Sequence, residues 1–120
     1  MTWTVAPDFD GVLHAYDGEW QGPTFIPGEP VPGAIEWLNE LAGEYKVAIC
    51  STRCNTVGGR DAIEAWLRES GLSAKAQLSV RAVAGKPAAL IYVDDRAWRF
   101  TGENFPSVDQ IRRALPWWKA

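Results

Sequence analysis

The stretch VAPDFDGVLH, residues 5–14, sets both the fold and the site. Residues 3–6 form an apolar run with one threonine, which favours a buried strand, and the run leads to two acids, Asp8 and Asp10, before Gly11. Carboxylates at the end of a buried strand need a partner that offsets their charge, because an uncompensated buried charge is costly. We therefore expect a ligand site directly after this strand.

Three later runs also have the composition of strands. They lie at residues 45–50, 78–83 and 89–93, and the second is the weakest. Apolar residues recur at helical spacings in residues 35–42, 62–67 and 108–115. Strands that alternate with helices predict βαβ units. We expect an α/β protein built as a Rossmann-like three-layer sandwich, with a mainly parallel central sheet and helices on both of its faces.

Two helix ends have recognisable signals. Gly71 follows the second predicted helix, where a left-handed cap is typical. Ser107 with Gln110 three residues later resembles a capping box and predicts the start of the third helix. The apolar side of that helix consists of Val108, Ile111 and Leu115.

Residues 14–33 are predicted to be a flap. Four glycines and four prolines occur between Gly18 and Gly33, a composition that favours turns and extended backbone over a helix. The segment is too short for a further domain, so we expect one domain over residues 1–120.

Composition excludes several classes of protein. The 120 residues are 47% hydrophobic, and no run is long enough to span a membrane. The net charge is -3 with scattered basic residues, so no general nucleic-acid binding is expected. Cys50 and Cys54 are expected to be reduced in a cytoplasmic protein, and Cys54 to be incidental to function. His14 is the only histidine, which argues against a structural zinc site.

Acids also follow the last predicted strand, as Asp94 and Asp95. In open parallel sheets, ligands bind beyond the carboxyl ends of the strands, so these acids should meet Asp8 and Asp10. Four carboxylates would repel one another without a cation, and an all-oxygen ligand set suits Mg²⁺. Ser51 after the second strand and Lys86 before the last would complete a phosphate site.

The order of these residues resembles the haloacid dehalogenase-like (HAD) superfamily. Four segments carry the resemblance, namely DFDGV at 8–12, ICSTR at 49–53, KP at 86–87 and YVDDRA at 92–97. A phospho-receiver domain uses similar residue types but places its phosphorylated Asp mid-chain, and this chain has no suitable central Asp. One departure is Pro7, which cannot donate a ladder hydrogen bond and is expected to loosen the first strand before Asp8.

The resemblance implies a role for each residue of these segments. Asp8 would be the nucleophile that becomes an aspartyl-phosphate, and Asp10 the general acid and base. Ser51 would hydrogen-bond the phosphoryl oxygens, and Lys86 would steady Asp8. Thr52 could replace Ser51, and Lys75 could replace Lys86.

The resemblance also implies a Mg²⁺ site and a substrate site. The metal would be held by the Asp8 carboxylate, the Asp10 main-chain carbonyl and Asp95, with Asp94 acting through water. Candidates for substrate contact are His14, Tyr16, Trp20, Thr52, Arg53 and Arg96. Neither gap between the motifs holds a cap domain, so the chain resembles a capless member, and such members tend to accept large substrates or to form homo-oligomers.

The expected function is Mg²⁺-dependent hydrolysis of a phosphomonoester, with a nucleotide or a phosphorylated nucleic-acid end slightly favoured. A phosphotransferase with the same intermediate, a metal-dependent nuclease and a non-catalytic binding module remain open. The seven tryptophans bear on the last of these, and we expect Trp117 and Trp118 to pack back on the core rather than form an exposed patch for a partner.

Overall fold

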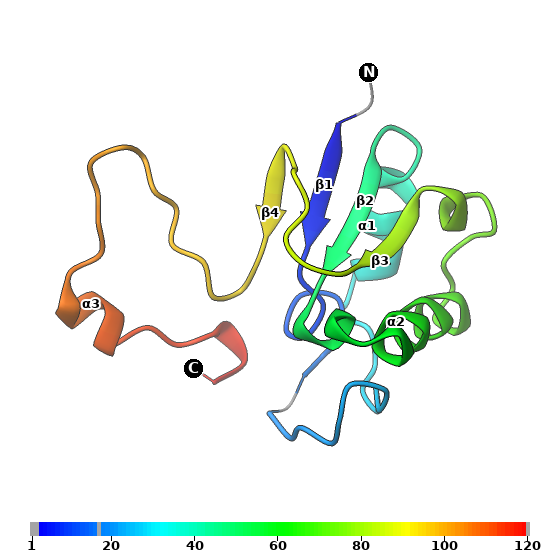
Figure 1. Cartoon of the computed structure of the whole chain (residues 1–120), viewed down its shortest axis with the longest axis horizontal. Coiled ribbons are helices and arrows are strands. Elements are labelled where there is room, and N and C mark those ends of the chain that lie inside the picture. Colours follow the sequence, from blue (N-terminus) through cyan, green and yellow to red (C-terminus); the bar gives the residue numbers. More distant parts are fainter. Residues whose placement is uncertain (1–2, 17, 120) are drawn as a thin grey trace.

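A single parallel sheet organises the chain (Figure 1). The computed structural model describes residues 3–16 and 18–119. The four strands are β1 (Thr4–Pro7), β2 (Lys46–Cys50), β3 (Val80–Val83) and β4 (Ile91–Val93), in the order β3-β2-β1-β4. Every neighbouring pair is parallel. The predicted α/β class and the parallel sheet are therefore confirmed, and the later strands are shorter than their apolar runs.

The strand order contains a topological switch point. The chain runs outward from β1 to β2 and β3, then returns to the other side of β1 to form β4. Connections on the two sides of β1 therefore diverge, which leaves a crevice beyond the carboxyl ends of β1 and β4. The first acid pair follows β1 and the second follows β4, so the sheet brings both pairs to this crevice.

Two helices cover one face of the sheet. They are α1 (Ala34–Leu41) and α2 (Val57–Glu69). Ile35 and Leu38 of α1 and Ile63 and Leu67 of α2 join one buried apolar cluster with the inward side chains of β2 and β3. The apolar spacing predicted both helices correctly. As predicted, Gly71 ends α2 with a φ of 109°, and the backbone N–H of Leu72 donates to the Leu67 carbonyl.

The remaining helical segments are short. They are the 3-10 turns η1 (Thr52–Asn55), η2 (Ala76–Leu78) and η3 (Trp117–Lys119), and the helix α3 (Val108–Arg112). The predicted capping box of Ser107 and Gln110 is present at the start of α3. No helix in the described residues is long and apolar enough to cross a membrane.

The predicted second helical layer is not seen in the part of the chain that the structure describes. Figure 1 shows α3 beyond β4, away from the sheet. Its apolar side is exposed, with Val108 64%, Ile111 60% and Leu115 65% accessible, and Leu115 lies beyond the helix end. The face of the sheet opposite α1 and α2 is instead hollowed by a groove of about 730 Å³, lined in part by Ile91 and Trp98.

Pro7 affects one side of β1 only. Successive N–H groups along a strand point to opposite neighbours, and the N–H of Asp8 donates to Val93 of β4. The backbone of Pro7 therefore faces β2, to which it can donate no hydrogen bond. The β1–β2 pairing stops before it, at Thr4 with Lys46 and Val5 with Val47. Pairing with β4 continues through Pro7 to Val93. The predicted loosening is seen on the β2 side, and the β4 side holds Asp8 in place.

The described part of the predicted flap is a loop fixed at its base. The N–H of Ala15 donates to the Glu29 carbonyl, and the N–H of Val31 donates to Leu13. The indole N–H of Trp66 on α2 donates to the Gly28 carbonyl. The loop therefore rests against the carboxyl end of the sheet, beside the acids.

Candidate active site

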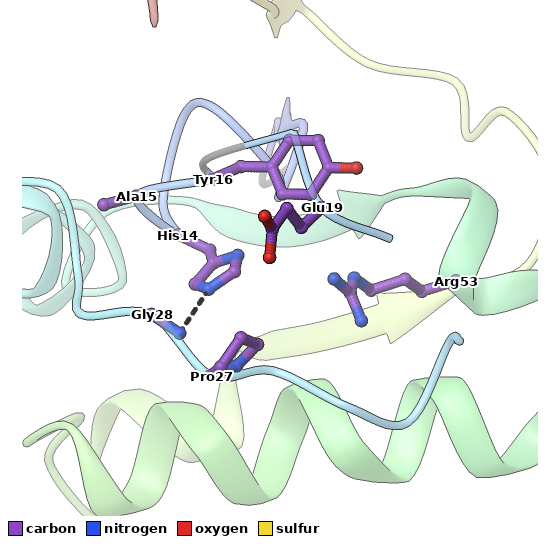
Figure 2. A pocket seen from close by; sticks show the side chains of 7 residues that line it. All are labelled: His14, Ala15, Tyr16, Glu19, Pro27, Gly28 and Arg53. Carbon is purple, nitrogen blue, oxygen red and sulfur yellow. Dashed lines mark hydrogen bonds between the residues drawn. The ribbon is translucent and has the colours of Figure 1, made fainter. Parts of the chain in front are cut away.

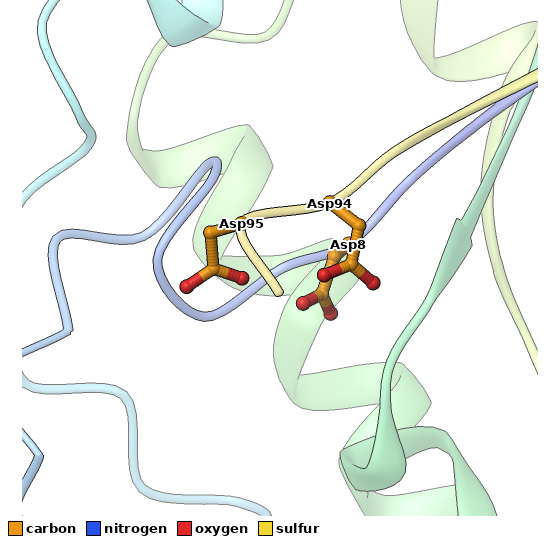
Figure 3. A group of neighbouring side chains, drawn as sticks. All are labelled: Asp8, Asp94 and Asp95. Carbon is orange, nitrogen blue, oxygen red and sulfur yellow. The ribbon is translucent and has the colours of Figure 1, made fainter. Parts of the chain in front are cut away.

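Three carboxylates meet at the switch point. Asp8 follows β1, and Asp94 and Asp95 follow β4 (Figure 3). Each offers an oxygen, and these oxygens all lie within 4.8 Å of one another. The hydrogen bond from the Asp8 N–H to the Val93 carbonyl, 2.8 Å, fixes the ends of the two strands side by side. The sequence prediction that four acids converge is therefore confirmed for Asp8, Asp94 and Asp95 and is wrong for the Asp10 carboxylate, whose oxygens bind His14 and Arg53 instead.

Burial and the neighbouring carboxylates disfavour the ionised form of Asp8. Burial raises the pKa of Asp8 from 3.8 to about 7; the backbone N–H of Phe9 opposes this, and the charges of Asp94, Asp95 and Asp10 add to it. Both burial and like charges disfavour the ionised form. A cation in the cluster would reverse both effects.

The donor set fits a hard divalent cation. All three side chains offer carboxylate oxygens, the ligands that Mg²⁺ prefers. One oxygen of Asp95, Oδ1, is buried and has no hydrogen-bond partner within the described residues. Buried polar atoms are rarely left without a partner, so an orphaned oxygen inside an acidic cluster is consistent with a metal ligand.

Two C-terminal tryptophans close over the cluster. The indole N–H of Trp118 donates to Oδ2 of Asp95 at 2.8 Å, and that of Trp117 donates to the Gly11 carbonyl at 2.6 Å. The prediction that they pack on the apolar core is wrong, because they contact the acidic site instead and Trp117 stays 56% exposed. Nothing in the local sequence signals this position, because the contact depends on the path of the whole segment after β4.

Gly11 is required by this closure. Its φ is 85°, and a Cβ there would overlap the Asp95 carboxylate and lie 2.7 Å from the indole nitrogen of Trp118. We expect Gly11→Ala to lower the free energy of unfolding by about 1–2 kcal/mol and to weaken Mg²⁺ binding about tenfold, because the carboxylate must move. Urea unfolding and calorimetric Mg²⁺ titration would measure the two effects.

The control for this variant is Gly33→Ala. Gly33 has nearly the same φ, 88°, but a Cβ there meets nothing within 4 Å. It should lose only the stability that the positive φ costs, less than Gly11→Ala, and keep wild-type Mg²⁺ affinity. Equal Mg²⁺ affinities in the two variants would show that Asp95 is not a ligand.

Asp10 points away from this cluster into a buried network. His14 accepts the Gly28 N–H at Nε2, at 2.9 Å (Figure 2), so its proton is on Nδ1, which donates to Oδ1 of Asp10 at 2.9 Å. Arg53 donates to both Asp10 oxygens, from Nε at 2.8 Å and from Nη2 at 3.0 Å. Burial raises the pKa of Asp10, but the hydrogen bonds from His14 and Arg53 and the charge of Arg53 outweigh it, so that its pKa is lowered.

Arg53 was predicted to contact substrate, and the structure gives it another place. It is only 2% exposed. Its Nη1 donates to the carbonyls of Gly22, Pro23 and Phe25 in the loop, at 3.2, 3.1 and 2.9 Å. Arg53 therefore joins Asp10 to the loop and has no free surface for a ligand.

His14 was also predicted to contact substrate, and it too is buried, at 1% exposed. It lines a small cavity of about 110 Å³ with Arg53 and the loop (Figure 2) and stacks on Phe9 with ring centroids 5.5 Å apart. Both ring nitrogens are used by Asp10 and Gly28. His14 and Arg53 are positioning residues for Asp10.

A second cavity, of about 280 Å³, opens beside Asp8. Ser51, Thr52 and Arg96, all predicted from the sequence, line it. The other lining residues are Asp8, Asp10, Tyr16, Trp20 and Trp118. The Ser51 side chain also caps η1 by accepting the N–H of Arg53, at 3.2 Å. Arg96 lies over the Trp118 ring, 5.4 Å from its centroid.

Lys86 does not reach Asp8 in the described structure. Its ammonium lies over the ring of Tyr92, 4.7 Å from the centroid, and it lines the groove on the open face of the sheet. No ion pair joins it to any acid among the described residues. The alternative, Lys75, precedes β3. It therefore lies towards the amino ends of the parallel strands, whereas the acids lie at their carboxyl ends.

The two cysteines are not activated. Burial raises the pKa of the Cys54 thiol, and burial with the charges of Asp8 and Asp94 raises that of Cys50. Neither thiol therefore has the thiolate character of a nucleophile, which agrees with the expectation that Cys54 is incidental.

Comparisons of the chain with protein-family models, with curated proteins and with solved structures found no match. The geometry of the acids and of the cavity is therefore the basis for assigning a function.

Proposed function

We propose that the protein is a Mg²⁺-dependent phosphomonoester hydrolase with a HAD-like core. The observation that carries this proposal is the convergence of Asp8 with Asp94 and Asp95 at the switch point of the sheet, beside a cavity that Ser51 and Thr52 line. A carboxylate nucleophile, an oxygen-rich cation site and hydroxyl donors are the groups that transfer through an aspartyl-phosphate requires.

The loops after β1 and β2 support a core without a cap domain. The described residues of 14–33 contain no helix or strand, and the residues between β2 and α2 form only the turn η1. A substrate would therefore reach Asp8 through the open cavity rather than beneath a separate domain.

The reaction follows two displacements. In the first, a carboxylate oxygen of Asp8 attacks phosphorus, the bond from phosphorus to the ester oxygen breaks, and the alcohol leaves. In the second, water attacks the phosphorus of the aspartyl-phosphate, which releases phosphate and restores Asp8. The hydroxyls of Ser51 and Thr52 donate to the phosphoryl oxygens, and Arg96 takes the charge-balancing part first assigned to Lys86.

Asp10 handles the proton in both steps. In the first step it takes up a proton from solvent and passes it to the leaving oxygen, and in the second step it accepts a proton from the attacking water. His14 and Arg53 keep it ionised in the resting protein, which is the form that the second step needs. Asp8, Asp94 and Asp95 would hold Mg²⁺, which would supply positive charge to offset that of the transferring phosphoryl group.

Phosphate release from a panel of phosphomonoesters tests the proposal. With Mg²⁺, wild-type protein should hydrolyse p-nitrophenyl phosphate and at least one natural ester. In EDTA the rate should fall more than about 100-fold, because without the cation the neighbouring carboxylates repel the charge of Asp8. Adding Mg²⁺ back should restore the rate.

Two results would contradict the proposal. One is hydrolysis that EDTA does not change. The other is silence on the whole panel by protein that is folded and binds Mg²⁺ by calorimetry. Faster turnover with added alcohols, without faster phosphate release, would instead identify a phosphotransferase.

A further inference from the structure

The cavity beside Asp8 has walls of two kinds. Three lining residues, Asp8, Ser51 and Thr52, are the groups expected to hold a phosphoryl group. Three others are aromatic side chains from separate parts of the chain, here called the aromatic wall: Tyr16 from the loop base, Trp20 from the loop and Trp118 from η3. The phosphomonoesterase chemistry uses none of these rings.

We propose that this wall binds the base of a nucleoside monophosphate, so that the substrate class is the mononucleotide. The inference rests on the proposed function, because the aromatic wall is placed relative to the phosphoryl site. Purine and pyrimidine rings stack on aromatic side chains whatever the identity of the base. The cavity, about 280 Å³, is just below the roughly 300–1,000 Å³ of small-molecule pockets and suits one nucleotide rather than a polymer.

The rings are held in position by other contacts. Trp118 is fixed by its bond to Asp95 and meets Tyr16 edge to face, with centroids 5.2 Å apart. The Arg53 guanidinium lies over the Trp20 ring, 4.7 Å from its centroid. Because Arg53 also binds Asp10, the position of Trp20 is tied to the catalytic carboxylates.

The Trp20 ring still presents free surface to a ligand. Trp20 is 51% exposed although Arg53 covers part of it. Arg96 lies over Trp118 and is itself exposed, so its guanidinium can reach a substrate phosphate or extend the stacked surface. Apart from the hydroxyls of Ser51, Thr52 and Tyr16, the Arg96 guanidinium and the two carboxylates, the cavity is lined by indole rings, which suits a ligand that carries a planar ring better than a sugar alone.

The test compares AMP with ribose 5-phosphate, which differ only in the base. With Mg²⁺, wild type should hydrolyse AMP with a kcat/KM at least about tenfold higher. Trp20→Ala should reduce this ratio to near one, mainly through KM, and Trp20→Phe should keep most of it. The control Trp3→Ala removes a tryptophan of similar exposure, 54%, at the amino end of β1, and should keep the wild-type ratio.

Binding to the Asp8→Asn variant is a readout that does not depend on turnover. AMP should bind at least about tenfold more tightly than ribose 5-phosphate by calorimetry, and Trp20→Ala in this background should abolish the difference. Equal hydrolysis and equal binding of the two compounds would overturn the nucleotide assignment and leave the phosphatase proposal standing. Preference for phosphotyrosine over AMP would also overturn it.

The two proposals fail in distinguishable ways. If the whole panel is silent but AMP binds in preference to ribose 5-phosphate, the phosphatase proposal is wrong and the aromatic wall is still a nucleotide site. If wild type hydrolyses sugar phosphates as well as nucleotides, only the nucleotide inference is wrong. If the whole panel is silent and neither AMP nor ribose 5-phosphate binds, both are wrong.

Discussion

Replacing Asp8 by Asn should abolish phosphate release and, in the absence of metal, stabilise the protein at neutral pH. An amide has the shape of the carboxylate but is not a nucleophile, so no aspartyl-phosphate forms. Loss of a covalent nucleophile typically costs several orders of magnitude. We expect kcat to fall at least about 1,000-fold, measured by phosphate release with Mg²⁺.

The stability effect has the opposite sign. The pKa of Asp8 is 3.8 in the unfolded chain and about 7 in the folded protein, so between these values the unfolded state releases a proton that the folded state retains. Wild-type stability should therefore be fully present below pH 3.8 and fall as the pH rises to 7. Asn does not titrate, so the Asp8→Asn protein does not lose this stability. Because solvent screens part of the electrostatic effect, we expect the variant to be about 1–2 kcal/mol more stable than wild type above pH 7.

Urea unfolding in EDTA at several pH values would measure this difference. Mg²⁺ should reverse the order, because it stabilises the wild-type cluster more than the variant. Asp61→Asn, which removes an exposed carboxylate on α2, should change neither activity nor the pH profile. A variant at Asp8 that kept a tenth of the activity, or that was less stable at every pH without metal, would exclude Asp8 from the proposed role.

The acids were predictable because their position depends on local patterns. A strand that ends in Asp8 and a later strand that ends in Asp94 and Asp95 need only the parallel order of the sheet to meet. That order follows from strands alternating with helices. Ser51 and Thr52 follow β2 by the same rule and line the same cavity.

The residues that sequence misplaced depend on longer paths. Lys86 lies in the connection between β3 and β4, and the path of that connection places its ammonium over the Tyr92 ring rather than beside Asp8. The sequence predicted the apolar side of α3 that Val108 and Ile111 form. Their spacing does not show whether that side packs on the sheet, and both side chains are exposed. The sequence likewise marked Arg53 as polar and near a motif, and could not show that loop carbonyls would surround it.

Arg53 is also the position where a substitution should cost most stability. Its side chain donates to both oxygens of Asp10 and to three carbonyls of the loop. Arg53 itself is only 2% exposed, so water cannot replace these bonds. Arg53→Met would leave the Asp10 carboxylate with His14 alone and would remove the donors of those carbonyls. Breaking one side of a buried ion pair typically costs about 3–5 kcal/mol, and we expect a loss of that size in urea unfolding.

A double-mutant cycle separates the ion pair from the contacts to the loop. Arg53→Met and Asp10→Asn should each be destabilising, and the double variant should lose at least about 1 kcal/mol less than their sum, because the pair is lost only once. The remaining cost of Arg53→Met then belongs to Gly22, Pro23 and Phe25. Arg53→Lys keeps the charge but not the planar fork, so it should lie between wild type and Arg53→Met.

The same variants report on the coupling of the loop to catalysis. If Arg53 holds Asp10 and Trp20 together, Arg53→Lys should lower kcat through the misplaced Asp10 and raise KM for nucleotides through the misplaced ring. Arg68→Met, at an exposed arginine of α2, is the control and should change none of these quantities. Additive energies in the cycle, or a cost below about 1 kcal/mol for Arg53→Met, would mean that the loop and Asp10 are positioned independently of Arg53.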